Sequence, residues 1–196
     1  MERPITGFLD RFNIKQLTAV ISSGGIAVLP TDTIYGFHCA STRLDAVEKI
    51  RRLKMRGRRT GFILLASDLR MVDGMVESWP GESRKLLACI WPASLTAILP
   101  ASERIPRILS LRGKVAVRVP DLKELRMLIR AVGEPIVSTS VNVTGTRALT
   151  RINDIKEAFP GIDAYVSQRG RPSSSPSTVV DFTVFPPCPI RIGSCH

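Results

Sequence analysis

The sequence predicts an α/β fold in which one sheet of mixed parallel and antiparallel strands is flanked by helices. Short apolar runs that end at proline, glycine or polar residues alternate with segments whose apolar residues recur at helical spacing. The alternation is only partial, which favours a mixed sheet over a wholly parallel one. With 196 residues, 44% of them hydrophobic and 23% charged, the chain can bury a sizeable core. We therefore expect one domain over residues 1–196.

The N-terminal part of the chain predicts a tail, a helix and a buried strand. Residues 1–8 carry no periodic pattern and are expected to form a loosely held tail. Apolar residues at helical spacing predict a helix over 13–21, which two glycines end. The apolar run 26–29 predicts a strand buried on both faces, and this strand should stop at Pro30 because proline cannot donate to a ladder.

The rest of the chain continues the alternation, beginning with a polar loop after Pro30. Ser41 or Thr42 is the candidate N-cap of the next helix. Gly133 marks the end of a later helix, and residues 169–176, rich in Gly, Pro, Ser and Arg, predict a mobile loop. Helices are expected at 44–53, 69–76, 82–91, 122–129 and 152–159, and strands at 62–66, 95–99, 115–119, 136–137, 164–166, 178–182 and 189–192.

The charge balance favours partners that carry phosphate. Lys and Arg number 28 against 17 Asp and Glu, giving a net charge of +11 and a pI near 10.3. Nucleotides and RNA are both plausible partners of such a surface, and general solubility is the alternative explanation. No apolar run resembles a signal peptide or reaches membrane-spanning length, so we expect a cytoplasmic protein with no membrane partner.

Several common catalytic and metal-binding patterns are absent from the sequence. The four cysteines (Cys39, Cys89, Cys188 and Cys195) form no CxxC pair and are expected to be free thiols. With only His38 and His196, a Ser-His-Asp triad or a multi-histidine metal site is hard to build. Neither GxxxxGK[ST] nor GxGxxG occurs, so scattered Lys and Arg would have to hold any nucleotide phosphates.

Polar side chains follow or interrupt several of the predicted strands. Hydroxyl and amide groups bind carboxylates, amines and ribose through directional hydrogen bonds, and arginine suits bidentate contact with a carboxylate or phosphate. Together they predict a site for an anionic, polar small molecule. The residues concerned are Thr33, Arg118, Ser138, Ser140, Asn142, Ser177 and Thr178.

Six motifs occur in order between about Gly24 and Arg191: PTDTIYG, KMR, WPASLT, VAVRVP, STSVNVTG and STVVD. In this order they resemble the YrdC/Sua5 family of threonylcarbamoyl-AMP synthases, in its short, single-domain form. The resemblance implies a YrdC-like twisted sheet, parallel and antiparallel, flanked by helices and presenting a basic concave ligand surface. It does not imply a Rossmann domain.

The resemblance also implies an activity and partners. Family members are nucleotidyltransferases that condense L-threonine, bicarbonate (or CO2) and ATP into threonylcarbamoyl-adenylate and pyrophosphate. Proteins of the threonylcarbamoyl transfer complex then pass the group to adenosine 37 of tRNAs that read ANN codons. Mg2+ would arrive with ATP, and no protein metal site is expected because the sequence shows no carboxylate cluster.

Residue by residue, the resemblance implies a threonine subsite and an ATP subsite. Lys54 and Arg56 would stabilise phosphate charge during the reaction. The threonine subsite would comprise Thr33, Arg118, Ser140 and Ser177, and the ATP subsite Lys54, Arg56, Thr60, Lys114, Ser138, Asn142, Thr150 and Arg191.

Structural alternatives remain open for some of these residues. Arg56 could belong to a solvated basic loop, Arg118 could pair with a structural carboxylate, and Thr150 could cap the helix that starts near Arg151. A different class of function also fits the charge: an RNA-binding or ribosome-associated YrdC-like protein without synthase activity, in contact with tRNA or double-stranded RNA. The sparse aromatic residues argue mildly against recognition of single strands by stacking.

Overall fold

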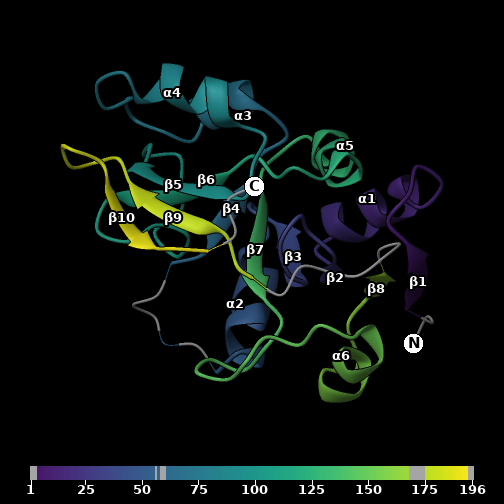
Figure 1. Ribbon diagram of the computed structural model, residues 1–196. Helices are drawn as coiled ribbons and strands as arrows, with labels where there is room; N and C mark the ends of the chain where they lie inside the picture. Colours follow the sequence, from purple (N-terminus) through teal and green to yellow (C-terminus); the bar gives the residue numbers. More distant parts are fainter. Residues whose placement is uncertain (1–3, 56, 58–60, 168–174, 194–196) are drawn as a thin grey trace.

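The computed structural model describes residues 4–55, 57, 61–167 and 175–193. Within these ranges the strands form one ten-stranded sheet in the order β1-β8-β2-β3-β7-β4-β6-β5-β9-β10 (Figure 1). Neighbours are parallel at β1/β8, β8/β2, β4/β6 and β5/β9, and antiparallel at the other junctions. The mixed sheet expected from the sequence is confirmed.

The elements follow the predicted order closely. The helices are α1 (Ile14–Ser22), α2 (Leu44–Leu53), α3 (Leu69–Asp73), α4 (Ser83–Ile90), α5 (Lys123–Val132) and α6 (Ile152–Ala158). The strands are β1 (Ile5–Phe8), β2 (Ala27–Leu29), β3 (Gly36–Ala40), β4 (Ile63–Leu65), β5 (Leu95–Pro100), β6 (Lys114–Arg118), β7 (Ile136–Ser140), β8 (Ala164–Ser167), β9 (Thr178–Asp181) and β10 (Cys188–Arg191).

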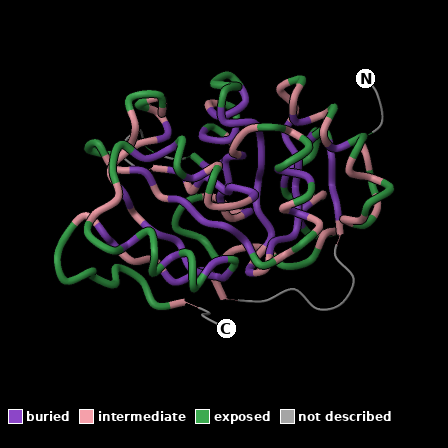
Figure 2. The backbone as a smooth tube through the Cα atoms, turned by 90° about the horizontal axis from the view of Figure 1, so that it is seen from above, coloured by how far each residue is buried: buried purple, intermediate pink, exposed green. Residues whose placement is uncertain are grey.

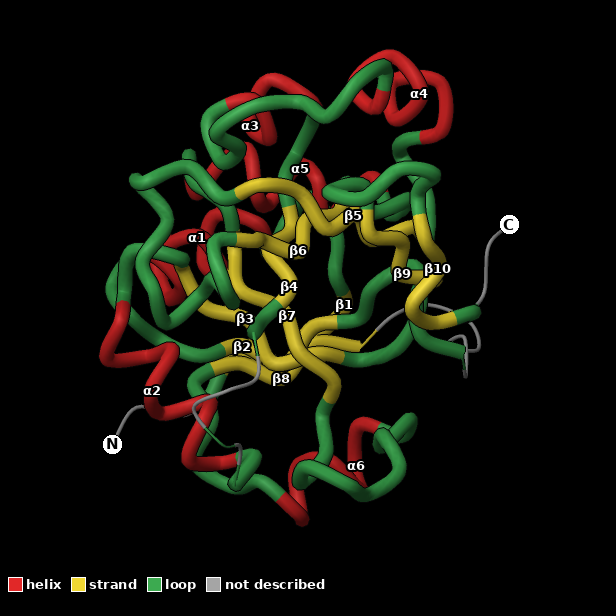
Figure 3. Tube along the Cα trace, turned by 90° about the vertical axis from the view of Figure 1, so that its left-hand side faces the viewer, coloured by secondary structure: helices red, strands yellow, loops and turns green. Residues whose placement is uncertain are grey.

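Helices cover both faces of the sheet, and the strands run through the buried interior (Figures 2 and 3). Alternate residues of β2 illustrate the two layers: Ala27 and Leu29 pack with α1 and α5, whereas Val28 faces the core that includes α2 and α6. Burial on both faces explains why β2 is an unbroken apolar run. Within the described ranges, no helix is both long and apolar enough to cross a bilayer.

Two strands were not expected from the sequence. Residues 5–8, predicted as part of a loose tail, form β1, which pairs in parallel with β8 and is extended by a hydrogen bond from Leu9 N to Ser167 O at 3.0 Å. This prediction was wrong because four residues interrupted by Gly7 give too short an alternation to recognise. Residues 36–40, predicted as loop, form the fully buried β3, whose small and polar residues hide its strand character.

The predicted N-cap of α2 is also wrong. The helix begins after Arg43, and no side chain caps it. The Ser41 and Thr42 hydroxyls instead donate to the carboxylate of Glu134, at 2.9 and 2.8 Å, and tie this turn to the end of α5. The two hydroxyls therefore bond to Glu134, which is distant in sequence, and not to the backbone at the start of α2.

Gly36 allows β3 and β7 to pack closely at the edge of the cavity described below. A Cβ at this position would lie 2.8 Å from His38 Cε1 and 3.1 Å from the Thr139 carbonyl oxygen. We expect Gly36→Ala to lower the free energy of unfolding by about 1–3 kcal/mol, because buried neighbours must move. Urea unfolding of Gly36→Ala beside Gly74→Ala, where the new Cβ meets nothing closer than 3.6 Å, tests this. Equal stability of the two variants would contradict it.

Candidate functional site

A cavity of about 390 Å³ lies where β3, β6 and β7 meet the segments after β7 and before β9. This volume is within the range of about 300–1,000 Å³ typical of small-molecule sites. Register brings the walls together, since Gly36 pairs with Ser140 across β3 and β7, and Leu65 pairs with Arg118 across β4 and β6. The lining residues are Thr31, Thr33, Ile34, Tyr35, Gly36, Gly61, Ile63, Arg118, Ser138, Thr139, Ser140, Asn142, Thr146, Arg147, Ala148, Pro176, Ser177 and Arg191.

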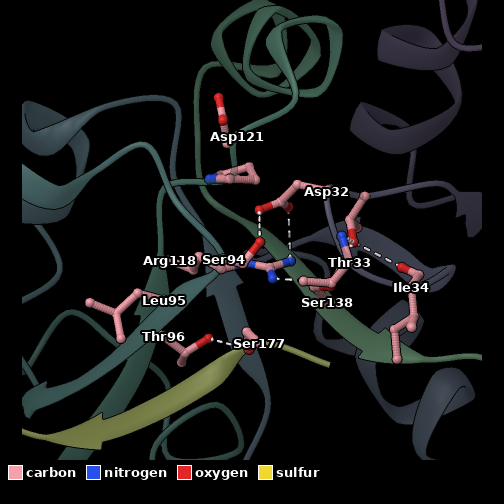
Figure 4. A network of polar contacts seen from close by, with 12 residues as sticks. Asp32, Thr33, Ile34, Ser94, Leu95, Thr96, Arg118, Asp121, Ser138 and Ser177 are labelled. Carbon is pink, nitrogen blue, oxygen red and sulfur yellow. Dashed lines mark hydrogen bonds and ion pairs between the residues drawn. The ribbon is translucent and has the colours of Figure 1, made fainter. Parts of the chain in front are cut away.

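Arg118 lines the cavity and lies beside Asp32 and Thr33 (Figure 4), and its near-complete burial marks the deep end of the cavity. Only 3% of the residue is exposed, and its Nη1 donates to the Thr33 hydroxyl at 3.1 Å. Its Nη2 lies 3.5 Å from Asp32 Oδ1, and the Ser94 hydroxyl donates to Asp32 Oδ2 at 3.0 Å. Arg118 therefore has the structural carboxylate partner that the alternative required, and it also lines the cavity beside Thr33. Its contact with L-threonine stays a prediction.

The charge on Arg118 is set by burial and by two charged neighbours. Burial lowers the pKa of the guanidinium, Asp32 opposes that shift, and Arg191 adds to it. Arginine remains protonated in proteins, so this group stays cationic. Its Nε makes no hydrogen bond within the described part of the chain. A carboxylate bound beside Thr33 would find a desolvated cation there.

Ser177, just before β9, and Arg191, at the end of β10, form another wall of the cavity. Arg191 donates from Nε to the Ser177 carbonyl at 3.1 Å and from Nη2 to the Ser177 hydroxyl at 3.2 Å. The Ser177 and Thr96 hydroxyls lie 2.8 Å apart. Partial burial lowers the pKa of Arg191. Two guanidinium groups thus approach one cavity, which favours an anionic occupant.

Ser140 and Asn142 form a third wall, and Lys54 holds it in place from behind. The Lys54 Nζ, in a residue only 3% exposed, donates to the carbonyl oxygens of Ser140 (2.5 Å) and Asn142 (2.9 Å) and to Asn142 Oδ1 (2.7 Å). The Ser140 hydroxyl also donates to Asn142 Oδ1, at 2.6 Å. Lys54 is absent from the lining, so in this structure its ammonium positions the wall.

Ser138 lines the cavity next to a buried histidine. Its hydroxyl oxygen lies 3.2 Å from His38 Nε2. Burial, with a smaller contribution from Arg118, lowers the pKa of His38 to about 3, so the imidazole is neutral at neutral pH. The sequence motifs pointed to Ser138 but gave its neighbour His38 no role.

The low pKa of His38 predicts a loss of stability in mild acid. In the unfolded chain the pKa of this histidine is about 6.5. Below that pH the unfolded chain binds a proton that the folded chain excludes, so the free energy of unfolding falls by up to about 1.4 kcal/mol for each unit by which the pH is lowered. Urea unfolding between pH 6.5 and 5, above the range of most carboxyl groups, should show this slope. His38→Gln should flatten it and His196→Gln, the control, should not. An unchanged slope in His38→Gln would contradict the prediction.

Besides Lys54, the predicted ATP residues Lys114 and Thr150 are absent from the lining of this cavity. Lys114 lines an adjoining cavity of about 680 Å³ that shares Gly61 and Ile63 with the first, and its Nζ donates to Asp181 Oδ2 at 2.9 Å. Burial would raise the pKa of Asp181, but hydrogen bonds from Thr183 and Lys114 hold it below its usual value. Thr150 is exposed, is absent from the lining, and makes no side-chain cap of α6, whose N-cap is Arg151.

Some predicted residues fall outside the described ranges, and some lining residues were not predicted. Arg56, Thr60 and most of the loop 169–176 lie outside, and so do Cys195 and His196. Thr31 was missed although it stands in the PTDTIYG motif, where it hydrogen-bonds Thr33 at 2.8 Å. Arg147 was missed because it follows Gly145 in a loop with no distinguishing pattern.

The lining of the cavity favours an anionic occupant. Its lining contains three arginines and several hydroxyl groups but no aspartate or glutamate among the described residues. Likewise, the described ranges contain no cluster of three or more His, Cys, Asp or Glu side chains able to hold a metal ion. The nearby carboxylates of Asp32 and Asp181 are each engaged by a cationic side chain. The hydroxyl groups and the fixed positive charge therefore favour a small molecule that is polar and anionic.

Comparisons with known proteins agree with this architecture. The family model for Sua5, YciO and YrdC, described as telomere recombination, matches residues 19–193. The threonylcarbamoyl-AMP synthase of Neisseria gonorrhoeae is 32% identical over 171 residues, covering 85% of this chain and 89% of the relative. That of Halorhodospira halophila is 33% identical over 160 residues, covering 81% and 84%.

Solved structures of proteins named Sua5 and YciO have the same fold as this chain. Sua5 of Pyrococcus abyssi complexed with L-threonine superposes with a TM-score of 0.90 at 28% identity, over 97% of this chain and 58% of that one. The present chain thus spans less than two thirds of that protein. Escherichia coli YciO superposes with a TM-score of 0.89 at 26% identity, over 100% and 98% of the two chains. The match over most of its length, together with the shared fold, means that this chain belongs to the Sua5/YciO/YrdC family.

Proposed function

We propose that this chain is a threonylcarbamoyl-AMP synthase, a nucleotidyltransferase that makes threonylcarbamoyl-adenylate and pyrophosphate from L-threonine, bicarbonate and ATP. One observation carries the proposal. Thr33, Arg118, Ser140, Asn142, Ser177 and Arg191, from distant parts of the chain, line a single cavity that contains no acidic side chain among its described lining residues. Relatives that carry this name match at about one third identity.

L-Threonine is assigned to the deep end, next to Arg118 and Thr33. The desolvated guanidinium would take the carboxylate, and the Thr33 hydroxyl, already a partner of Arg118, would help to fix its orientation. The Ser140 and Ser177 hydroxyls on the other walls would select the polar part of the amino acid. The Pyrococcus Sua5, which shares the fold, forms a complex with L-threonine, and this supports L-threonine as the amino acid that is bound.

The reaction requires no protein nucleophile. Bicarbonate takes up a proton and loses water to give CO2, the threonine amine adds to this CO2 and loses a proton to form a carbamate, and a carbamate oxygen then attacks the α-phosphorus of ATP. The bond from the α-phosphorus to the bridging oxygen breaks, and pyrophosphate leaves with that electron pair. The protein contributes position and fixed positive charge. Lys54 acts by holding Ser140 and Asn142 on the cavity wall.

Mg2+ is proposed to enter bound to ATP, where it would neutralise phosphate charge. The donors present support this, because Asp32 and Asp181 are already paired with Arg118 and Lys114. Arg56 and Thr60 remain predicted phosphate contacts. Lys114 could meet ATP only from the adjoining cavity, and Thr150 only after a rearrangement of its loop.

The product is a mixed anhydride that other proteins would consume. We propose that the proteins of the threonylcarbamoyl transfer complex pass the group to adenosine 37 of tRNA, with the basic surface available for contact with tRNA. A net charge of +11 supports an encounter with RNA but does not by itself define a binding site.

Release of pyrophosphate tests the proposal. We expect release only when L-threonine, bicarbonate and ATP are all present, with threonylcarbamoyl-adenylate as the co-product detected by mass spectrometry. Each substrate is omitted in turn. Release that is indifferent to threonine or to bicarbonate would reject the mechanism.

The alternative, an RNA-binding protein without synthase activity, makes the opposite prediction. If the protein binds RNA without synthase activity, its affinity for RNA should fall steeply as the salt concentration rises. That affinity should be unchanged in Thr33→Val and Ser140→Ala, since neither substitution alters the net charge. The synthase requires that these substitutions impair pyrophosphate release. The convergence of hydroxyl and guanidinium groups on one cavity favours the synthase.

A further inference from the structure

Arg147 is a cavity-lining arginine for which neither the sequence motifs nor the threonine subsite provides a role. It lies in the loop between β7 and α6, is exposed, and lines the same cavity as Arg118 and Arg191. Within the described ranges no carboxylate lies within ion-pair distance of it, whereas Arg118 has Asp32 and Arg191 has the Ser177 oxygens.

The loop that carries Arg147 is anchored to the cavity wall. The Asn142 amide donates to the carbonyls of Val143 at 2.9 Å and Thr146 at 2.7 Å. The Thr144 backbone N–H donates to the Lys54 carbonyl at 2.9 Å, and that of Leu149 donates to the Val141 carbonyl at 2.9 Å. The backbone on both sides of Arg147 is therefore held in place, and the exposed Arg147 side chain lines the cavity from this anchored loop, which we call its rim.

The proposed reaction determines what lies at this rim. In an in-line displacement at the α-phosphorus the leaving group points away from the attacking oxygen. If the threonine carbamate lies at the buried end beside Arg118, pyrophosphate must lie toward the exposed end, where Arg147 is. This part of ATP also carries most of its negative charge, which an arginine binds through paired hydrogen bonds.

We propose that Arg147 binds the terminal phosphates of ATP and the pyrophosphate that they become. The assignment of the leaving-group end rests on the proposed function, but binding of a polyphosphate anion at the rim can be measured without any reaction. A rim position is also consistent with departure of pyrophosphate directly to solvent.

Calorimetric titration of the full chain with inorganic pyrophosphate tests the proposal. We expect Arg147→Met to weaken pyrophosphate binding about tenfold or more, because a charge-assisted hydrogen bond is lost. Arg147→Lys should restore part of the affinity, since it keeps the charge without the planar fork. Arg151→Met is the matched control: it removes the same charge from an exposed site that pairs with Asp154 at 4.0 Å and does not line the cavity.

In the synthase assay Arg147→Met should raise the KM for ATP while leaving L-threonine binding within about twofold of wild type. Normal pyrophosphate binding by Arg147→Met, or an equal loss in Arg151→Met, would overturn the proposal and leave the synthase assignment intact. Conversely, pyrophosphate binding that depends on Arg147 in a protein without threonine-dependent turnover would uphold the anion site and reject the synthase.

Discussion

Replacing Arg118 by methionine should reduce threonine-dependent pyrophosphate release about 100-fold or more. The substitution removes the buried cation that we assign to the threonine carboxylate and the donor that holds the Thr33 hydroxyl at 3.1 Å. It also leaves Asp32 buried without its cation, which should lower the free energy of unfolding by about 3–5 kcal/mol. Steady-state kinetics and urea unfolding measure the two effects.

Arg118→Lys separates catalysis from stability. Lysine keeps a positive charge near Asp32 but cannot present a planar fork to a carboxylate and to Thr33 together. We expect most of the stability to be retained while the KM for L-threonine rises about tenfold. Arg126→Met, which removes an arginine that bonds to the Pro120 carbonyl and Asp121 outside the cavity, is the control. A normal KM for threonine in Arg118→Lys would contradict the threonine subsite.

Replacing Lys54 by methionine should abolish measurable synthase activity and destabilise the fold. The carbonyl oxygens of Ser140 and Asn142 and Asn142 Oδ1 accept hydrogen bonds from this one buried ammonium, and the Ser140 hydroxyl oxygen lies 3.5 Å from it. Asn142 Oδ1 would keep its hydrogen bond from the Ser140 hydroxyl, but the two backbone carbonyls would lose this donor. An unsatisfied acceptor costs about 1–3 kcal/mol, so we expect the free energy of unfolding to fall by about 2 kcal/mol or more. The wall formed by these two residues should then shift and misplace its polar groups.

The control for Lys54→Met is Lys49→Met in α2, the helix that ends just before Lys54, where Lys49 is exposed. We expect wild-type kinetics and stability for that variant. Because Lys54 acts through the wall in this structure, its loss should weaken binding of L-threonine and of ATP together, as calorimetry with each ligand can measure. Full activity in Lys54→Met would show that the wall does not depend on the ammonium.

Much of the fold could be predicted from local patterns. The helix over 44–53 was found because its apolar residues recur at helical spacing, and β2 because an apolar run stops at Pro30. The strand β3 was not predicted, because Gly36, His38 and Cys39 do not form the alternating or β-branched pattern typical of a strand. These residues form a strand because antiparallel pairing with β2 and β7 provides hydrogen-bond partners for their backbone groups. The tight packing around Gly36 also favours a small residue.

The sequence alone determined the chemical character of the site and the family resemblance, since both depend on residue types in a fixed order. Only the tertiary structure decided which groups share the cavity. It placed Thr33, Arg118, Ser140, Asn142, Ser177 and Arg191 on its walls, Lys54 behind one wall, Lys114 in the adjoining cavity, and Arg147 unexpectedly at the rim. The physical reason is that strand register and the pairing of buried charges act between residues far apart in the chain, where no local pattern can reveal them.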